Sequence, residues 1–435
     1  MRILIISTYF PPLNSIASHR PYSWAKYWSL AGHEVTVLTM EKKVDPKTAL
    51  LLPNTGFKLI EVGLPKFMHA LKKQYESASL TASCPTPCGR FRSFFKAQCI
   101  KIFDYLRFKI GIFNACRMPD TTSLWVKPAL DAVKNEKAWD LVISSAGPYT
   151  VHLVAEKLKR LKKASKWIAD YRDPWSENYL YKGLFPFNIY ERYLEKKILA
   201  SADCITTVST EFADIYKAKY GKDKVSIIEN GYDFEENIPI LEEPLLPQDG
   251  KYRIIHTGSL YQNKRDPSAL FEGIRLLNED QKNKLLLDKL EVLFIGNRQA
   301  NLDALIDKYQ VGKWVKAFGF VSREKALTLQ KEAHALLFLP WNDPAVDGVL
   351  TGKIFEYLVV GRPILAVGCK EMEASQKLIM EAKAGVVLPQ AEQIKEYLEK
   401  QLRHVQKETV QVSVEILQRY DRKKLAMKLI EHMAL

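Results

Sequence analysis

The sequence has no apolar run that approaches the 18 or more residues that a membrane-spanning helix needs. Cysteines are also few, six in 435 residues, which excludes a disulfide scaffold. Four of them, Cys84, Cys88, Cys99 and Cys116, cluster, but the CxxC pairs typical of zinc ribbons are missing. We therefore expect reduced, independent thiols.

Glycine and proline, 20 and 21 residues, are too few for a low-complexity chain. Apolar residues make up 47% and charged residues 26%, which are values typical of globular proteins. A chain of this length is expected to form two domains. The opening Met1–Ser7 is too short for a signal peptide and indicates a first buried strand, so we expect a cytoplasmic protein, soluble or peripheral to a membrane.

The formal net charge of +14 is unevenly distributed. Between Leu64 and Arg117 there are ten basic residues and only Glu76 and Asp104 as acids. More than half of the excess charge therefore lies in one stretch, which indicates an anionic partner beside it.

Short β-branched runs alternate with longer helical patterns, which predicts an α/β fold of parallel sheets with crossover helices. The first half has six candidate strands: Arg2–Ser7, Glu34–Thr39, Lys58–Val62, Asp140–Ser145, Lys166–Asp170 and Cys204–Ser209. The second half has six more: Arg253–Thr257, Glu291–Gly296, Val315–Gly319, Ala335–Leu339, Pro363–Val367 and Gly385–Leu388. Two doubly wound domains are expected, with ligands outside the carboxyl ends of the strands, in a cleft between the domains.

The acidic, proline-bearing stretch Glu235–Gly250 is the best linker in the chain. It predicts an N-terminal domain over 1–236, a linker over 237–250 and a C-terminal domain over 251–407. Residues 408–435 have a helical period and are expected to form helices that could pack back on the first domain.

Residues 90–113 combine an aromatic stripe at spacings of three and four with basic residues that fall largely elsewhere around a helix. This composition is typical of an interfacial helix on an anionic membrane. The alternative is a helix whose aromatic face packs on its own domain. The concentrated charge favours the membrane.

Three loops of the first half carry candidate polar groups. The loop after the first strand lacks GxGxxG, but Ser15, His19 and Arg20 could meet an acceptor or a phosphate, unless it is an ordinary loop. In Asp170–Trp175, Arg172 and Asp173 could hold sugar hydroxyls; alternatively, Arg172 pairs with an aspartate and only fixes the loop. His152, after Ser144–Pro148, is a similar but weaker candidate.

In the second half, Gly258 and Ser259 end a strand, and Lys264 and Arg265 precede a helix. Gly258 permits close approach to the backbone, and the two cations stand where a diphosphate needs positive charge. The alternative is a solvated basic turn.

The strongest element is Asp347–Leu358, a glycine-bearing turn that opens a helix. The helix N-terminus with Thr351, Gly352 and Lys353 is suited to an anion, and Glu356 can accept hydrogen bonds from the vicinal hydroxyls of a ribose. A solvated Lys–Glu pair on a packed helix is the alternative. The turn Gly361–Pro363 and Asn230, in Glu229–Asp233, strengthen the prediction of a site.

The chain resembles the retaining nucleotide-sugar glycosyltransferases of glycosyltransferase family 4 (glycosyl transferases group 1), which have the GT-B fold of two Rossmann-like domains. The segments that carry the resemblance are YFPP, DYRDPW, VSIIENGYD, HTGSLYQNKRDPS and TGKIFEYLVVGRPIL. It implies a nucleotide diphosphate held mainly by the C-terminal domain and an acceptor facing the N-terminal domain.

By this resemblance, Glu356 matches the second acid of the E-x7-E motif and contacts the ribose, and Lys264 contacts the diphosphate. The first acid of the motif falls at Gly348, with Asp347 one residue away, and Ser259 replaces the usual phosphate-binding arginine. Backbone groups around Gly348–Thr351, or Asp347 itself, are candidates to replace the acid, and Arg265 to replace the arginine.

The resemblance further implies transfer with retention at the anomeric carbon and no requirement for a metal or other cofactor. The candidate catalytic residues are Arg172, Asp173, His152 and Lys264; the candidate donor-binding residues are Gly258, Ser259, Lys264, Arg265, Asn230, Thr351, Gly352, Lys353 and Glu356; the acceptor side has Ser15, His19 and Arg20. Leaving-group charge is expected to be stabilised by Lys264, Arg265, Lys353 and the helix N-terminus.

Three functions remain open from the sequence. The first is a transferase that builds a surface polysaccharide on a lipid-linked or oligosaccharide acceptor at the inner face of the cell membrane, with an anionic membrane surface bound through 90–113 and no nucleic-acid partner. The second is a nucleotide-sugar 2-epimerase of the same fold. The third is a catalytically silent binding subunit, which the missing acid and arginine suggest.

Overall fold

The computed structural model describes residues 1–434 with ten gaps. The gaps are 47–48, 66–104, 107–109, 111–115, 179–180, 235–240, 261–263, 297–299, 342–349 and 369–373. Most of the basic aromatic segment 90–113 therefore lies outside the described residues, as do Asp347, Gly348 and the first part of the expected linker.

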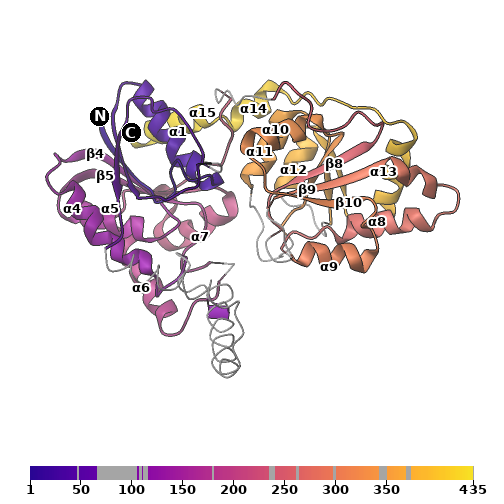
Figure 1. Cartoon of the computed structure of the whole chain (residues 1–435). Coiled ribbons are helices and arrows are strands. Elements are labelled where there is room, and N and C mark those ends of the chain that lie inside the picture. The colour runs from indigo at the N-terminus through magenta and orange to yellow at the C-terminus, as the bar shows by residue number, and fades with distance from the viewer. Residues whose placement is uncertain are drawn as a thin grey trace, which may run out of the picture. The chain divides into compact units, whose positions relative to one another are not determined.

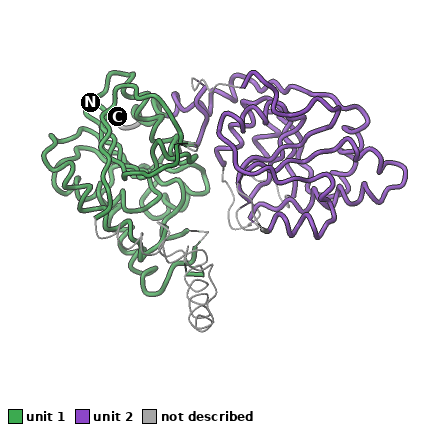
Figure 2. Tube along the Cα trace, viewed as in Figure 1, with its two compact units in different colours: residues 1–229, 426–435 green, residues 230–425 purple. Residues whose placement is uncertain are grey.

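The chain divides into two compact units (Figure 2). Unit 1 comprises Met1–Glu229 together with Ala426–Leu435, and unit 2 comprises Asn230–Leu425. The chain thus passes from one unit to the other twice, at 229–230 and at 425–426.

Unit 1 is built on a seven-stranded parallel sheet in the order β3-β2-β1-β4-β5-β6-β7 (Figure 1). Its strands are β1 (Arg2–Ile6), β2 (Glu34–Met40), β3 (Lys58–Val62), β4 (Trp139–Ser145), β5 (Ala164–Tyr171), β6 (Cys204–Thr207) and β7 (Val225–Ile227). Its helices are α1 (Ile16–Leu30), η4 (Thr121–Trp125), α4 (Val126–Val133), α5 (Thr150–Arg160), α6 (Phe187–Ser201), α7 (Thr210–Tyr220) and η5 (Lys222–Lys224), and α15 (Arg422–Ala434) ends in this unit.

The central strand β1 is apolar on both faces, and Ile3, Leu4, Ile5 and Ile6 have no exposed surface. Successive side chains of a strand point to opposite faces, so both faces of the sheet must be covered by helices. Because the strand order reverses at β1 and β4, the right-handed crossovers place α1 and α5 on opposite faces. Trp28 of α1 donates through Nε1 to the carbonyl oxygen of Ala426 at 3.0 Å, which joins α15 to α1 (Figure 1).

Unit 2 repeats this design with a six-stranded parallel sheet in the order β10-β9-β8-β11-β12-β13. Its strands are β8 (Tyr252–Thr257), β9 (Leu290–Ile295), β10 (Val315–Gly319), β11 (Ala335–Phe338), β12 (Ile364–Val367) and β13 (Gly385–Leu388). Its helices are α8 (Ser268–Glu279), η6 (Lys284–Lys289), α9 (Ala300–Tyr309), α10 (Arg323–Glu332), α11 (Gly352–Val360), α12 (Ala374–Glu381), α13 (Ala391–Arg403) and α14 (Val414–Arg419).

The predicted fold class is confirmed, because both units are doubly wound parallel sheets flanked by helices. All twelve expected strands are present, with ends within two residues of the expected ones. The strand β7 was not predicted; it has only three residues and lacks a periodic pattern of its own. Among the residues that the structure describes, no helix is long and apolar enough to cross a membrane.

Candidate functional site

In unit 2, the strand order reverses between β8 and β11, which is where doubly wound sheets bind ligands. Gly258 follows β8 with φ +113°, a conformation that side-chain-bearing residues rarely adopt. A Cβ built on Gly258 would overlap Nζ of Lys353, so the ammonium group rests against the backbone of this glycine. Gly258 itself is exposed, which leaves the backbone beside the ammonium group accessible to a ligand.

The charge on Lys353 is unfavourable in the absence of a ligand. Burial, followed by the positive charge of Arg265, lowers the pKa of Lys353 to about 7, although Glu356 acts in the opposite direction. Arg265 is itself only 6% exposed. Two cations thus lie within electrostatic reach of each other beside an open backbone, and a bound anion would stabilise both.

Lys353 lies in the first turn of α11, whose N-cap is Thr351. The Thr351 side chain makes no capping hydrogen bond, and its Oγ1 is buried without a partner among the described residues. The cap side chain therefore leaves the N-terminal N–H groups of α11 available, and such groups are suited to a phosphate. Asn230 reaches the same turn, because its Nδ2 donates to the carbonyl oxygen of Leu350 at 3.3 Å.

Glu356 is held by two residues of α10. Its carboxylate accepts hydrogen bonds from Arg323 Nη1 at 3.2 Å and from Gln330 Nε2 at 2.7 Å. Gln330 Nε2 also donates to Thr257 Oγ1 at 3.1 Å, which fixes the glutamate beside the end of β8. The Glu356 side chain is 17% exposed. Glu356 is thus bound by Arg323 and Gln330, and it does not form the solvated pair with Lys353 that was the alternative.

The structure brings most of the predicted donor-binding residues of unit 2 to one end of its sheet. Gly258 and Ser259 follow β8, Lys264 and Arg265 precede α8, and Thr351, Gly352 and Lys353 begin α11. Ser259 and Lys264 are half-buried. The contributions of Gln330 and Arg323 were not predicted. A glutamine and an arginine on an amphipathic helix carry no sequence signal for a partner that is 26 or 33 residues away.

In unit 1, a buried ion pair occupies the corresponding end of the sheet. Arg20 Nη2 lies 2.7 Å from Asp170 Oδ1, and Ser145 and Thr206 each donate to the same carboxylate at 2.8 Å. Burial alone would raise the pKa of Asp170, but the Arg20 charge and these hydrogen bonds outweigh it, so the pKa is lowered. Arg20 also donates from Nη1 to the carbonyl oxygen of Glu229 at 2.8 Å.

Arg20 was predicted to face the acceptor, and in this structure its donors are directed to Asp170 and Glu229. Of the other two acceptor-side candidates, Ser15 caps α1 by accepting from Ala17 N at 3.3 Å, and His19 is buried. Their role toward an acceptor stays a prediction.

Arg172 fixes a loop through backbone groups. Its Nη2 donates to the carbonyl oxygen of Ala146 at 2.6 Å, and its guanidinium lies over the ring of Tyr9, 5.4 Å from the centroid. Gly147, with φ +99°, leaves room for it, because a Cβ there would lie 2.6 Å from Nη2. Asp173 is exposed at the start of the next loop.

His152 has no exposed surface. Its Nδ1 lies 2.8 Å from Ser144 Oγ, which also accepts from Trp167 Nε1 at 2.8 Å, and its ring stacks on Tyr171 at 4.3 Å. Burial lowers the pKa of His152 to about 3, so the ring is neutral at physiological pH. The catalytic role predicted for it requires contact with a ligand, and that role stays a prediction.

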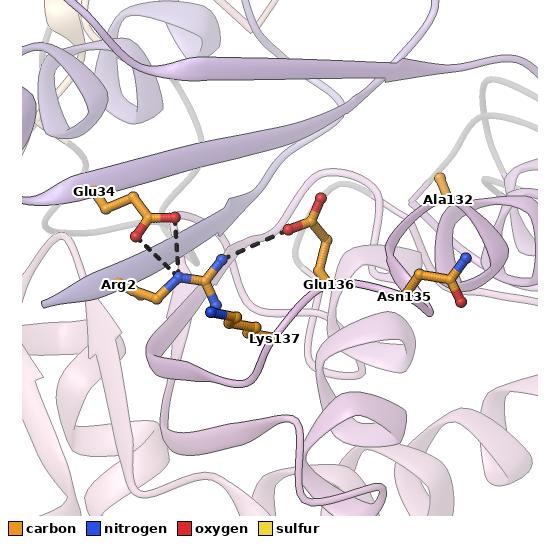
Figure 3. A pocket seen from close by; sticks show the side chains of 6 residues that line it. All are labelled: Arg2, Glu34, Ala132, Asn135, Glu136 and Lys137. Carbon is orange, nitrogen blue, oxygen red and sulfur yellow. Dashed lines mark hydrogen bonds and ion pairs between the residues drawn. The ribbon is translucent and has the colours of Figure 1, made fainter.

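A hollow of about 490 Å³ opens at the opposite end of the sheet of unit 1 (Figure 3). It is lined by Arg2, Glu34, Ala132, Asn135, Glu136 and Lys137. Arg2 is already paired with Glu34 at 2.9 Å and with Glu136 at 3.6 Å. Since it lies at the amino ends of the strands and its central cation is neutralised, we do not assign a ligand to it.

The family model of Glycosyltransferase Family 4 matches residues 99–236. A search of curated proteins gives no match. The solved structures similar to the chain include sucrose-phosphate synthase from Thermosynechococcus elongatus, with a TM-score of 0.61 and 14% identity over 99% of this chain and 98% of that chain. They also include "Trehalose-6-phosphate from E. coli bound with UDP-2-fluoro glucose", with a TM-score of 0.59 and 11% identity over 99% and 98%. A third is the N-terminal domain of Candida albicans trehalose-6-phosphate phosphatase, with a TM-score of 0.59 and 14% identity over 100% and 96%.

These comparisons confirm the fold and the family resemblance that the sequence predicted. The chain has the GT-B architecture, and it carries the Glycosyltransferase Family 4 match in the part that includes β4, β5, β6 and β7. The comparisons thus show a GT-B fold over the whole chain and a Glycosyltransferase Family 4 match over residues 99–236.

Proposed function

We propose that the protein transfers a sugar from a nucleoside diphosphate sugar to an acceptor hydroxyl, with retention at the anomeric carbon. The observation that carries the proposal is the placement of Nζ of Lys353 against the exposed backbone of Gly258, within electrostatic reach of Arg265, at the switch point of a doubly wound sheet. A diphosphate would bring negative charge to the ammonium group of Lys353, a residue that is half-buried, and to the guanidinium of Arg265.

In the proposed reaction, the bond between the anomeric carbon and the diphosphate oxygen breaks, and the diphosphate leaves with the electron pair. The acceptor oxygen forms the new bond to the same carbon on the same face, and its proton passes to the departing diphosphate oxygen. Lys353, Lys264, Arg265 and the N-terminal N–H groups of α11 stabilise the charge that develops on the diphosphate. With these groups supplying the positive charge, we propose that the reaction needs no metal, and we assign no side chain as nucleophile.

Glu356 is proposed to bind the ribose of the donor. Its carboxylate can accept further hydrogen bonds besides those from Arg323 and Gln330, and the side chain is partly exposed. A UDP-sugar is a reasonable first donor to test, since one of the similar solved structures is bound with UDP-2-fluoro glucose. GDP-sugars remain an equal alternative from the sequence.

For the acceptor, we propose a lipid-linked or growing surface-polysaccharide glycan at the cytoplasmic face of the membrane. The support is the concentration of ten basic residues between 64 and 117 and the aromatic stripe of 90–113. An anionic membrane beside this stretch would bring a lipid-linked acceptor to unit 1, whose polar loops follow β1, β4 and β5.

The test is a panel of UDP- and GDP-sugars, scored first by thermal stabilisation and then by turnover with a lipid-linked acceptor. A donor that binds only the native state raises the melting temperature, and nuclear magnetic resonance of the product reports whether the anomeric configuration is retained. Activity should persist in a metal chelator. Epimerised free sugar nucleotide formed without acceptor would instead identify a 2-epimerase, and binding without turnover or hydrolysis would identify a silent subunit.

A further inference from the structure

Helix α6 of unit 1 and the loop before it expose an unusual set of side chains. Five large apolar or aromatic residues lie on the surface: Phe185 is 73% exposed, Phe187 37%, Ile189 57%, Tyr190 52% and Tyr193 62%. Isolated exposed apolar residues are common, but a contiguous group marks an interaction site. In Figure 1, α6 lies at the periphery of unit 1.

The basic side chains of this segment are exposed, whereas its acidic side chains are buried. Residues 181–200 contain four basic residues, Lys182, Arg192, Lys196 and Lys197, and all four are exposed. They contain two acids, Glu191 and Glu195, and both are buried, at 0% and 2% exposure. The outward surface therefore presents only positive charge between its aromatic side chains.

Specific partners hold the two glutamates inside. Arg117 Nη2 lies 3.1 Å from Glu191 Oε2, and the backbone N–H of Met118 donates to Glu191 Oε1 at 2.5 Å. Ser176 donates to Glu195 Oε2. Burying two carboxylates while exposing five apolar side chains is the reverse of what water favours for a helix. The orientation of α6 is explained if its outward face meets a surface that is both apolar and anionic.

We propose that the segment 182–197 is a docking surface for an anionic lipid bilayer, which we call the α6 surface. Aromatic side chains insert at the level of the headgroups, and exposed lysines and arginines bind anionic lipids. A second copy of this chain is a poorer occupant, because symmetric pairing would bring four cations against four cations. The proposal rests on the membrane acceptor proposed above, and it assigns the contact with the membrane to residues outside 90–113.

The α6 surface adjoins the described part of that basic aromatic segment. The backbone N–H of Gly183 donates to the carbonyl oxygen of Ile110 at 3.0 Å, and Tyr105 is 58% exposed. Ile110 of that segment thus lies beside the loop that precedes α6, in the same unit.

The experiment is co-sedimentation of the full chain with vesicles of phosphatidylcholine, with and without phosphatidylglycerol. The triple variant F185S/Y190S/Y193S is expected to bind the anionic vesicles at least about tenfold more weakly than wild type. The matched control is F318S/F320S, which removes two aromatics of unit 2 that are 50% and 53% exposed, and it should bind as wild type. All altered side chains are at the surface, so the folds are expected to be retained, and melting temperatures verify this.

A second variant tests the charges. K182Q/R192Q/K196Q/K197Q is expected to weaken binding to anionic vesicles and to reduce its dependence on salt. Absence of vesicle binding by wild type, or undiminished binding by both α6 variants, would overturn the proposal. A loss of self-association in the triple variant without a loss of vesicle binding would assign the surface to a second copy instead.

Donor binding separates this proposal from the proposed function. Thermal stabilisation by a nucleotide sugar should be the same in wild type and in both α6 variants, because the altered residues belong to unit 1 and the proposed donor site to unit 2. A protein that binds vesicles through α6 but is stabilised by no nucleotide sugar would refute the proposed donor chemistry and leave the α6 surface standing.

Discussion

Nζ of Lys353 occupies the space that a side chain on Gly258 would need, since a Cβ at residue 258 would overlap it. The glycine is thus required twice, for its positive φ and for the room it leaves to the ammonium group. This relationship ties the end of β8 to the start of α11, two elements that are far apart in the sequence.

Replacing Gly258 with alanine should therefore affect both stability and donor binding. The φ of +113° makes a Cβ unfavourable, and a residue in such a conformation costs about 1–3 kcal/mol. The displaced Lys353 should weaken donor binding as well. Gly319 is the matched control, because it lies in the same unit with φ +88° and nothing within 4 Å of its Cβ position. Both variants should lose stability in urea denaturation, but only G258A should lose donor affinity; equal affinities would contradict the proposed role.

The lowered pKa of Lys353 makes the stability of the ligand-free protein depend on pH. Its pKa is about 7 in the folded protein and about 10.4 in an unfolded chain. Below pH 7 the folded state must carry the unfavourable charge, and this destabilisation is relieved as pH rises from about 7 to about 10. Lys353→Met should be more stable than wild type at about pH 6, with a difference that shrinks toward about pH 10 in denaturation curves. A constant difference would show that Lys353 does not titrate in this range.

Donor binding should restore the charge of Lys353. A diphosphate beside the ammonium group raises its pKa, so donor binding at about pH 8 should take up a proton. Calorimetry in two buffers of different ionisation enthalpy measures this uptake. Lys353→Met should bind more weakly by at least about tenfold, as expected for a lost charge-assisted hydrogen bond. If Lys353→Met still binds the donor and still takes up a proton on binding, another group must bind that proton.

Glu356 and Lys353 should respond differently to the parts of the donor. If Glu356 binds the ribose, Glu356→Gln should weaken the affinity for a nucleoside diphosphate but not for inorganic pyrophosphate. Lys353→Met should weaken both. The glutamine variant keeps an oxygen that can accept from Arg323 or Gln330, so its melting temperature should change little. Competition with a fluorescent nucleotide gives the affinities, and equal losses for the two ligands in E356Q would argue against the ribose contact.

The sequence predicted those parts of the molecule that depend on local patterns. Buried strands such as Ile3–Ile6 are continuous apolar runs, and α11 begins at Gly352, directly after the glycine-bearing turn that predicts a helix there. The partners of Glu356 were not predictable in this way. Gln330 and Arg323 reach it only because β11 lies beside both β8 and β12, which brings α10 against α11. Likewise, the sequence left open whether Arg172 holds sugar hydroxyls or pairs with an aspartate, and it gave no signal for the hydrogen bonds that Arg172 donates to the carbonyl oxygen of Ala146.

Arg20 should be among the most important residues for the stability of unit 1. It is paired with Asp170, which is completely buried, and removing one partner of a buried pair typically costs about 3–5 kcal/mol. Arg20→Met leaves the carboxylate without its cation, so the pKa of Asp170 should rise. The difference in free energy of unfolding between R20M and wild type should therefore narrow as pH falls from about 7 toward about 5, because protonation of Asp170 removes the buried charge. Arg2→Met is the control: its pair with Glu34 is partly exposed, so its loss should cost less than about 1 kcal/mol. Urea denaturation at the two pH values measures both effects. If R20M loses no more free energy of unfolding than R2M does, the hydrogen bonds from Ser145 and Thr206 are enough to stabilise the Asp170 carboxylate.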